Sequence, residues 1–187
     1  RFYKMKKVAC FIPIKHNSQR VVGKNLRTLG GKPLYRHTLD IVKNMDCFDD
    51  VYVDTDSEEI IDYCKNNDIK TIERIPELLE DSATGNDLFN HWIKTQPNYD
   101  IYYQIHVTCP FMTEKSIKGC VDTLTDSNDY NSVLSAIEEK SWYWFDGKPI
   151  NYDPTNFGRS QDAMGVVRET TCLYGIRKNA FFENNCR

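Results

Sequence analysis

Several familiar signals are missing from this sequence of 187 residues, and each absence excludes a class of protein. No apolar run approaches the roughly 20 residues that a bilayer-spanning helix needs, and the start, RFYKMKKVAC, lacks the apolar core of a signal peptide. The pattern G-x-x-x-x-G-K-[ST] is absent, which excludes an ordinary P-loop NTPase, and there is no G-x-G-x-x-G. We therefore expect a cytoplasmic protein without a membrane partner.

A strong excess of one charge is also missing. The net charge is -3, with acids and bases spread throughout, which argues against nucleic acid or an anionic membrane as the main partner. No C-x-x-C pair occurs among the seven cysteines, whose wide and irregular gaps predict reduced thiols and mostly small core residues. They are Cys10, Cys47, Cys64, Cys109, Cys120, Cys172 and Cys186.

Alternating strand and helix patterns are present along most of the chain. Six short apolar or β-rich runs predict strands at 8–14, 51–55, 70–73, 101–107, 132–138 and 172–176. Between them, Pro33 suits a first helical turn, and Asp56 is a predicted N-cap followed by Glu58 and Glu59. Thr113 is a second predicted N-cap. The alternation predicts one α/β domain over 1–187, with a mostly parallel sheet and right-handed crossovers.

The stretch 140–162 departs from this rhythm. Its aromatic residues, which follow neither a helical nor a strict strand period, are Trp142, Tyr143, Trp144, Phe145, Tyr152 and Phe157. Aromatic residues outside regular elements either cover a core or meet another surface. An extension that packs on a second subunit or rims a pocket, and a plain packed loop, both remain open.

The loop that follows the first predicted strand is rich in cations. Residues 10 to 25 read CFIPIKHNSQRVVGKN, in which Lys15, Arg20 and Lys24 lie close together. Potential hydrogen-bond donors to phosphate oxygens in the same loop are Asn17, Ser18, Gln19 and Asn25. Because ligands of open parallel sheets sit at the carboxyl ends of the strands, this loop predicts a polyphosphate site, with a solvated basic loop as the alternative.

Ordered motifs along nearly all of the chain resemble the acylneuraminate cytidylyltransferase family, the CMP-sialic acid synthetases, and the related CMP-Kdo synthetases. In IPIKHNSQRVVGKNL…GGKPL, the matching positions are Ser18, Arg20, Lys24, Asn25 and Lys32. VDTDSEEI, RIPELLEDSATGND, HVTCPF and RSQD…ETTCLYGI follow in the family's order. The resemblance implies a Rossmann-like three-layer nucleotide-diphospho-sugar transferase fold, with 140–162 as an extended arm that builds a homodimer.

The resemblance also implies a reaction and a set of site residues. CTP and an acidic nine-carbon 2-keto sugar would give the CMP-sugar and pyrophosphate. Catalytic roles fall on Lys15, Arg20 and Lys24. Nucleotide-binding roles fall on Pro13, Ile14, Asn17, Ser18, Gln19, Asn25, Arg74, Ser82, Ala83 and Thr84. Sugar-binding roles fall on His106, Thr108, Arg159, Gln161 and Tyr174. Without the resemblance, an Asp or Ser that caps the next helix explains EDSATGND about equally well.

Departures from the family pattern matter for the choice of sugar. Lys15 stands where Arg is usual, which keeps the charge but loses the planar fork, and Val22 replaces a common Pro. His106 stands where sialic-type members have Gln and Kdo-type members have a magnesium-binding Asp. Imidazole can hydrogen-bond a sugar hydroxyl but is a poor ligand for a hard cation, which disfavours the Kdo branch.

A magnesium cofactor is expected from the resemblance, but its ligands are not predicted here. Sialic-type enzymes carry their Asp-x-Asp in a segment beyond residue 187, so we expect the chain to be a piece of a longer one. Alternation places Asp54 and Asp56 on the same side of a strand, which makes a metal site there an alternative to helix capping. A binding domain without turnover and a transferase for another sugar, such as Kdo, remain alternatives.

Overall fold

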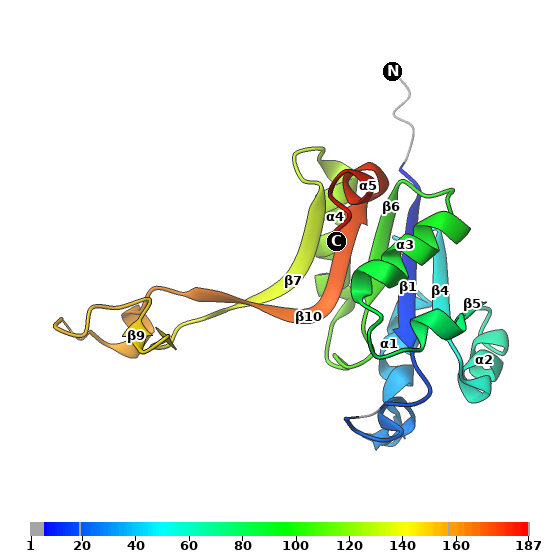
Figure 1. Cartoon of the computed structure of the whole chain (residues 1–187), viewed down its shortest axis with the longest axis horizontal. Helices are drawn as coiled ribbons and strands as arrows, with labels where there is room; N and C mark the ends of the chain where they lie inside the picture. The colour runs from blue at the N-terminus through cyan, green and yellow to red at the C-terminus, as the bar shows by residue number, and fades with distance from the viewer. Residues whose placement is uncertain (1–5, 19, 157, 187) are drawn as a thin grey trace. The chain divides into compact units, whose positions relative to one another are not determined.

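The computed structural model describes residues 6–18, 20–156 and 158–186, which form two compact units. Within these residues the first unit comprises 6–134 and 172–186, and the second comprises 135–171 (Figure 1). Within the same residues, no helix combines the length and the apolar character that crossing a membrane requires. The predicted single domain over 1–187 stays a prediction.

A six-stranded sheet has the order β5-β4-β1-β6-β10-β7. Its strands are β1 (Val8–Ile14), β4 (Asp50–Thr55), β5 (Lys70–Glu73), β6 (Ile101–Ile105), β7 (Ser132–Glu139) and β10 (Val166–Arg177). The first four strands of that order are parallel, and β10 runs antiparallel to β6. The predicted mostly parallel α/β sheet is confirmed. Strand β10, which the sequence predicted over 172–176, begins earlier, at Val166.

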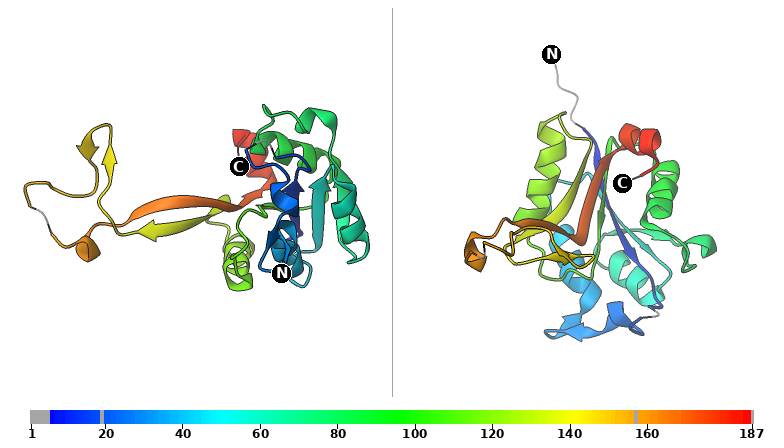
Figure 2. Two further views of the ribbon diagram at one scale, coloured as in Figure 1. Left: turned by 90° about the horizontal axis from the view of Figure 1, so that it is seen from below. Right: turned by 60° about the vertical axis from the view of Figure 1, so that its left-hand side comes forward.

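Helices pack on both faces of the sheet, giving three layers (Figure 1, Figure 2). They are α1 (Leu34–Val42), α2 (Glu58–Lys65), α3 (Gly85–Thr95), α4 (Glu114–Asp126) and α5 (Lys178–Asn184), with 3-10 turns η1 (Lys24–Leu26), η2 (Pro76–Leu78) and η3 (Ser160–Asp162). Buried residues of α1, α2 and α4 share one core cluster, and those of α3 and α5 share the other. The predicted Rossmann-like three-layer architecture is confirmed.

Strand β1 contributes to both clusters because its side chains alternate between the two faces. Cys10 and Ile12 belong to the first cluster, whereas Ala9 and Phe11 belong to the second. The ring of Phe11 stacks on Trp92 of α3, with 4.9 Å between centroids. Burying a side chain of this size contributes about 1.5–3 kcal/mol, so the continuous apolar run fixes β1 at the centre of the sheet.

The carboxyl ends of the four parallel strands lie along one edge of the sheet. Ile14 of β1 is in register with Thr55 of β4, which in turn is in register with Glu73 of β5. The segments that begin after these strands therefore start side by side. This edge is where an open parallel sheet presents its ligand site.

Helix caps differ in part from the prediction. Thr113 caps α4 as predicted, since its hydroxyl accepts from the Ser116 N-H. Ser57, not Asp56, occupies the N-cap position of α2, because the Asp56 carboxylate accepts instead from the His16 N-H at 2.6 Å. The sequence left open an Asp or Ser of EDSATGND as the cap of the next helix, but Thr84 caps α3, through a reciprocal capping box with Asp87.

The prediction that the cysteines are reduced is wrong for one pair. Cys109 and Cys172 form a disulfide across 63 positions of sequence, with 5.5 Å between their Cα atoms. Leu173 of β10 pairs with Ile105 of β6, so the antiparallel ladder ends with Cys172 beside the turn that holds Cys109. Sequence spacing does not report which strands are neighbours, and the β6-β10 pairing could not be read from it.

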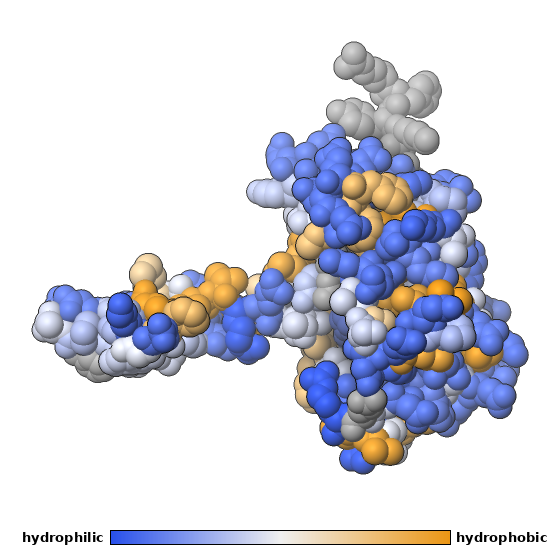
Figure 3. Space-filling view, in the orientation of Figure 1, coloured by the Kyte–Doolittle hydropathy of each residue, from blue (hydrophilic) through white to orange (hydrophobic). Residues whose placement is uncertain are grey.

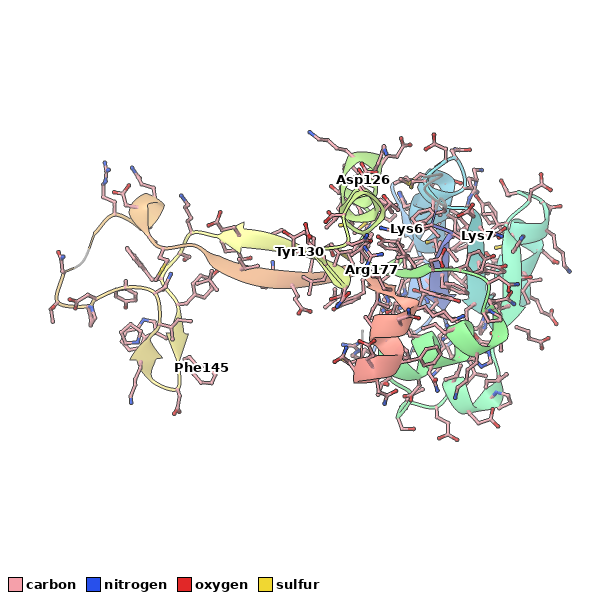
Figure 4. The ribbon with its side chains drawn as sticks, turned by 90° about the horizontal axis from the view of Figure 1, so that it is seen from above. Lys6, Lys7, Asp126, Tyr130, Phe145 and Arg177 are labelled. Atoms are coloured by element: carbon pink, nitrogen blue, oxygen red, sulfur yellow. A yellow bond between two sulfur atoms is a disulfide. The ribbon has the colours of Figure 1, made fainter. Side chains whose placement is uncertain are left out.

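Among its described residues, the second unit contains a short hairpin. Strands β8 (Trp144–Phe145) and β9 (Lys148–Pro149) are joined by Asp146 and Gly147, both at positive φ. The Phe145 side chain is labelled in Figure 4 and is 75% exposed. Hydrophobic residues gather on the visible face of this unit (Figure 3). The predicted dimer contact of 140–162 stays a prediction.

Asp40 of α1 ties a small hairpin to the helices. Lys32, which belongs to the hairpin of β2 (Thr28–Leu29) and β3 (Lys32–Pro33), donates to Asp40 Oδ2 at 2.7 Å, and Tyr63 donates to Oδ1. Burial acts to raise the pKa of Asp40, but the hydrogen bonds from Lys32 and Tyr63 outweigh it and hold the pKa below its usual value.

Asp40→Asn is expected to lower the free energy of unfolding by about 1 kcal/mol at pH 7. Because the pKa of Asp40 is depressed in the folded state, its stabilisation is complete above the unfolded pKa of about 3.9 and is lost as the pH falls through the folded pKa. Urea unfolding of both proteins at pH 7 and at pH 3 measures this, with Asp62→Asn on an exposed face as the control. An equal difference at both pH values would contradict the assignment.

Candidate active site

An open cleft of about 500 Å³ lies at the carboxyl edge of the parallel strands, within the first unit. Its described lining residues are Pro13, Lys15, Asn17, Ser18, Arg20, Lys24, Asn25, Arg74, Asp81, Ala83, Leu88, His106, Val107 and Thr108. They come from the end of β1 and the loop after it, from the segments after β5 and η2, from the first turn of α3, and from the turn after β6. The structure thus brings together most of the residues that the sequence predicted for the site.

All three predicted catalytic cations line the cleft. Lys15, Arg20 and Lys24 come from one loop and its 3-10 turn η1. The Lys15 Nζ lies 3.5 Å from Asp81 Oδ1, and these side chains are 29% and 60% exposed. An exposed pair at this distance is weak, about 0–1 kcal/mol, so a more highly charged anion can displace the carboxylate. The cleft is therefore suited to binding an anion.

The cationic loop is held at both of its ends. At the start, the His16 N-H donates to Asp56, and the ring Nδ1 of His16 lies 3.2 Å from Ser57 Oγ. Near the end, Asn25 Nδ2 donates to the Lys15 carbonyl at 2.8 Å, and Gly23 adopts a φ of 62° that favours glycine. These bonds fix the backbone from which the cations project.

Asn25, which the sequence predicted to donate to phosphate oxygens, is buried and holds the loop backbone. One of its amide hydrogens is committed to the Lys15 carbonyl. Among the described residues its Oδ1 atom has no hydrogen-bond partner, although Asn25 is 6% exposed. Because the Lys15 carbonyl cannot donate, the amide cannot be turned around, and Asn25 ties the two ends of the loop together.

Arg74 forms a buried ion pair beneath the cleft. Its Nε donates to Asp54 Oδ1 at 2.5 Å, and its Nη2 donates to the Asp54 carbonyl at 3.0 Å. The other carboxylate oxygen of Asp54 accepts from Trp92 Nε1 at 2.5 Å. The side chains of Arg74 and Asp54 are 5% and 0% exposed. Arg74 therefore lines the cleft while it anchors the end of β4.

This arrangement removes the alternative of a metal site at Asp54 and Asp56. Both oxygens of Asp54 are occupied by protein donors, and Asp56 binds the His16 backbone. No group of three or more His, Cys, Asp or Glu side chains in the described part of the chain could hold a metal ion. The donor set of the cleft, whose described carboxylate is Asp81, does not fit magnesium by itself.

The predicted nucleotide-binding segment is only partly in the cleft. Ala83 lines it, but Ser82 lines a neighbouring hollow and Thr84 serves as the cap of α3. Ile14 is fully buried in the core cluster, so its side chain lies outside the cleft lining. Gln19 lies outside the described residues.

The predicted sugar-binding residues divide in the same way. His106 and Thr108 line the cleft, whereas Tyr174 is buried behind His106, with its ring edge-on to the imidazole and 6.4 Å between centroids. Arg159 and Gln161 belong to the second unit, where Arg159 Nε donates to Asp162 at 2.7 Å. The sugar contacts of these last two residues stay predictions.

Three lining residues were not among the predicted site residues. Asp81 falls within the quoted segment EDSATGND, and its carboxyl group was the signal that could have found it. The side chains of Leu88 and Val107 carry no polar group. Leu88 lines the cleft from the first turn of α3, and Val107 from the turn after β6. Apolar cleft residues of this kind are visible only once the fold is known.

Comparison with known proteins adds to this geometry. The family model described as Cytidylyltransferase matches residues 9–153. This chain belongs to that family. It is 27% identical over 175 residues to the N-acylneuraminate cytidylyltransferase of Oncorhynchus mykiss, a match that covers 89% of this chain and 40% of the relative. The predicted resemblance is confirmed.

Two further matches place this cytidylyltransferase family member among its relatives. It is 30% identical over 188 residues to the pseudaminic acid cytidylyltransferase of Campylobacter jejuni, covering 94% of this chain and 81% of the relative. A solved structure of CMP:2-keto-3-deoxy-manno-octonic acid synthetase complexed with CTP has a TM-score of 0.71 at 18% identity, covering 95% of this chain and 78% of that chain. That last likeness concerns the fold.

The chain spans less than half of the N-acylneuraminate cytidylyltransferases that it matches, between 32% and 42% of their length.

Proposed function

We propose that this chain carries the cytidylyl-transfer site of an enzyme that joins CTP to an acidic 2-keto sugar of the sialic acid type and releases pyrophosphate. The observation that carries the proposal is the cleft itself. Three cations from one anchored loop, Lys15, Arg20 and Lys24, line it at the carboxyl edge of the sheet, in a chain of the cytidylyltransferase family.

The geometry supports a reaction by positioning and charge stabilisation. The anomeric hydroxyl of the sugar gives up its proton to solvent and attacks the α-phosphorus, the new O-P bond forms, and the bond to the pyrophosphate oxygen breaks. Lys15, Arg20 and Lys24 stabilise the negative charge that gathers on the leaving pyrophosphate. The anchored backbone of the loop holds these groups in place before the substrates arrive, which lowers the entropic cost of the reaction.

The choice of a sialic-type acid rests on the wall that carries His106 and Thr108. An imidazole at this position can donate to or accept from a sugar hydroxyl but is a poor partner for magnesium. The named relatives that support this choice act on acylneuraminic and pseudaminic acids. Kdo or another acidic sugar is the alternative acceptor.

We also propose a cytoplasmic homodimer that uses magnesium. The exposed aromatic residues of the second unit, Trp144 at 59% and Phe145 at 75%, support a contact with a second copy, because aromatic side chains that are neighbours on a surface are typical of protein interfaces. The magnesium ligands would come from outside the described cleft residues, so no part of the mechanism above depends on them.

A pyrophosphate-release assay of the full-length protein tests the function. CTP, magnesium and a panel of acidic sugars are supplied, and release is expected with CTP and a sialic-type acid. ATP and GTP in place of CTP are the controls for the base. CTP binding without release for any sugar would favour the alternative of a binding domain without turnover. That alternative is supported by the absence of a carboxylate cluster among the described residues.

A further inference from the structure

We propose that Cys109 and Cys172 are a reversible redox pair that fastens the sugar-side wall of the cleft. The pair is placed to do this because Cys109 follows the wall residues directly. Val107 and Thr108 line the cleft, and the Cys109 N-H donates to the His106 carbonyl at 3.3 Å, so these four residues form one tight turn. Any movement of Cys109 therefore moves the wall.

Cys172 anchors that turn to the neighbouring strand β10. Its carbonyl accepts from the His106 N-H at 2.9 Å, beside the disulfide from its side chain to Cys109. The wall is thus tied to β10 by a covalent bond as well as by backbone hydrogen bonding. A backbone hydrogen bond has a small net effect on stability because both groups can bond to water instead, so loss of the covalent bond lets the turn open more often after reduction.

The backbone next to Cys172 is strained, which gives the wall a second reason to relax. Thr171 has a φ of 56°, a left-handed conformation that is an outlier for a β-branched residue. Such conformations persist where the surrounding structure over-determines them. With the disulfide broken, one of the bonds that hold this region is lost, and the strain at Thr171 favours a changed path for Cys172.

Both members of the pair can be reached from solvent. Cys109 and Cys172 are partly exposed, as are Cys47 and Cys120, whereas Cys10 and Cys64 are buried in the core. Burial raises the pKa of Cys64 to about 12, which keeps it a thiol and makes it a poor nucleophile. Cys186 is exposed and lies outside the disulfide, so it serves as the control.

The chemistry is thiol-disulfide exchange with a small-molecule disulfide such as oxidised glutathione. The Cys109 thiolate attacks one sulfur and releases one molecule of reduced thiol. The Cys172 thiolate then attacks the mixed disulfide at the Cys109 sulfur and releases the second thiol. Two protein thiols are oxidised, one small disulfide is reduced to two thiols, and the two protons lost by the protein thiols end on the two released thiols. A Cα separation of 5.5 Å matches the usual span of a protein disulfide.

Hydrogen exchange tests the pair in the full-length protein, without any need for turnover. The protein is equilibrated with oxidised glutathione or with dithiothreitol, and the state of each cysteine is read by alkylation and peptide mass spectrometry. The amides of His106, Cys109 and Met112 are expected to exchange at least tenfold faster in the reduced form. Cys109→Ser and Cys172→Ser are expected to match reduced wild type in both buffers, and Cys186→Ser is expected to behave as wild type.

Equal exchange at these amides in the two redox states would overturn the proposal, as would failure of the bond to form with oxidised glutathione. A further expectation rests on the proposed function: reduction should raise the KM for the acidic sugar at least threefold while CTP affinity changes less than twofold. No turnover with any sugar in either state would defeat the proposed function and leave the exchange result to decide the redox pair. An unchanged KM in an active enzyme whose wall does loosen would remove the link to sugar binding.

Discussion

Replacing Lys24 by alanine is expected to weaken CTP binding at least tenfold. Lys24 begins the 3-10 turn η1, directly after the left-handed Gly23, and lines the cleft with Lys15 and Arg20. A hydrogen bond from a charged group contributes about 1.5–3 kcal/mol, and 1.4 kcal/mol corresponds to a factor of ten in affinity. Titration calorimetry with CTP measures the change.

Lys65→Ala is the matched control for this prediction. Lys65 lies on α2, and its side chain is 69% exposed, with Nζ 3.6 Å from Asp62 Oδ1. It is not among the described cleft residues. Its removal should leave CTP affinity unchanged within twofold. Because the Lys24 effect is electrostatic, raising the salt concentration should reduce wild-type affinity more than that of the variant. Equal affinities of Lys24→Ala and wild type would remove the loop from the nucleotide site.

The largest expected loss of stability follows from Asp54→Ala, at roughly 3–5 kcal/mol. The substitution leaves the guanidinium of Arg74 and the indole N-H of Trp92 buried without their acceptor, since both now donate to Asp54 at 2.5 Å. A buried charge without a partner is costly, and the cost arises mainly from the group left behind. Urea unfolding followed by far-UV circular dichroism measures the loss.

Two further variants make this result interpretable. Asp54→Asn keeps an oxygen acceptor and most of the shape, so its loss should be smaller than that of Asp54→Ala. Asp122→Ala removes a carboxylate from an exposed ion pair with Lys118 on α4, 2.8 Å apart, and should cost less than 1 kcal/mol. A loss for Asp54→Ala as small as that of Asp122→Ala would show that the buried pair does not anchor β4.

Much of the fold could be predicted from the sequence because its signals are local. The run VACFIPI is buried on both faces as β1, and the hydroxyl of Thr113 begins α4. The cation-rich loop followed from a local count of charge, and its three cations do line one cleft. Family motifs added the segments around Arg74 and His106, which no single stretch of sequence would have connected.

The remaining features depend on contacts between distant segments. Asp54 has the appearance of a metal ligand until the fold places Arg74 and Trp92 against it. Cys109 and Cys172 lie 63 positions apart and become partners through the antiparallel β6-β10 ladder. Sequence spacing could give neither result, because both depend on which strands and helices lie side by side.

The ion pair beneath the cleft also bears on how mutational surveys of this family are read. Under the proposed function, a library scored by product yield would rank Asp54 and Trp92 beside Lys24, since variants of all three lower the yield. The first two would do so by lowering the amount of folded protein in the cell, and Lys24 by lowering the output of each molecule. Arg74 would lower both, because it lines the cleft and also pairs with Asp54. Recording abundance alongside yield separates residues that support the cleft from residues that work within it.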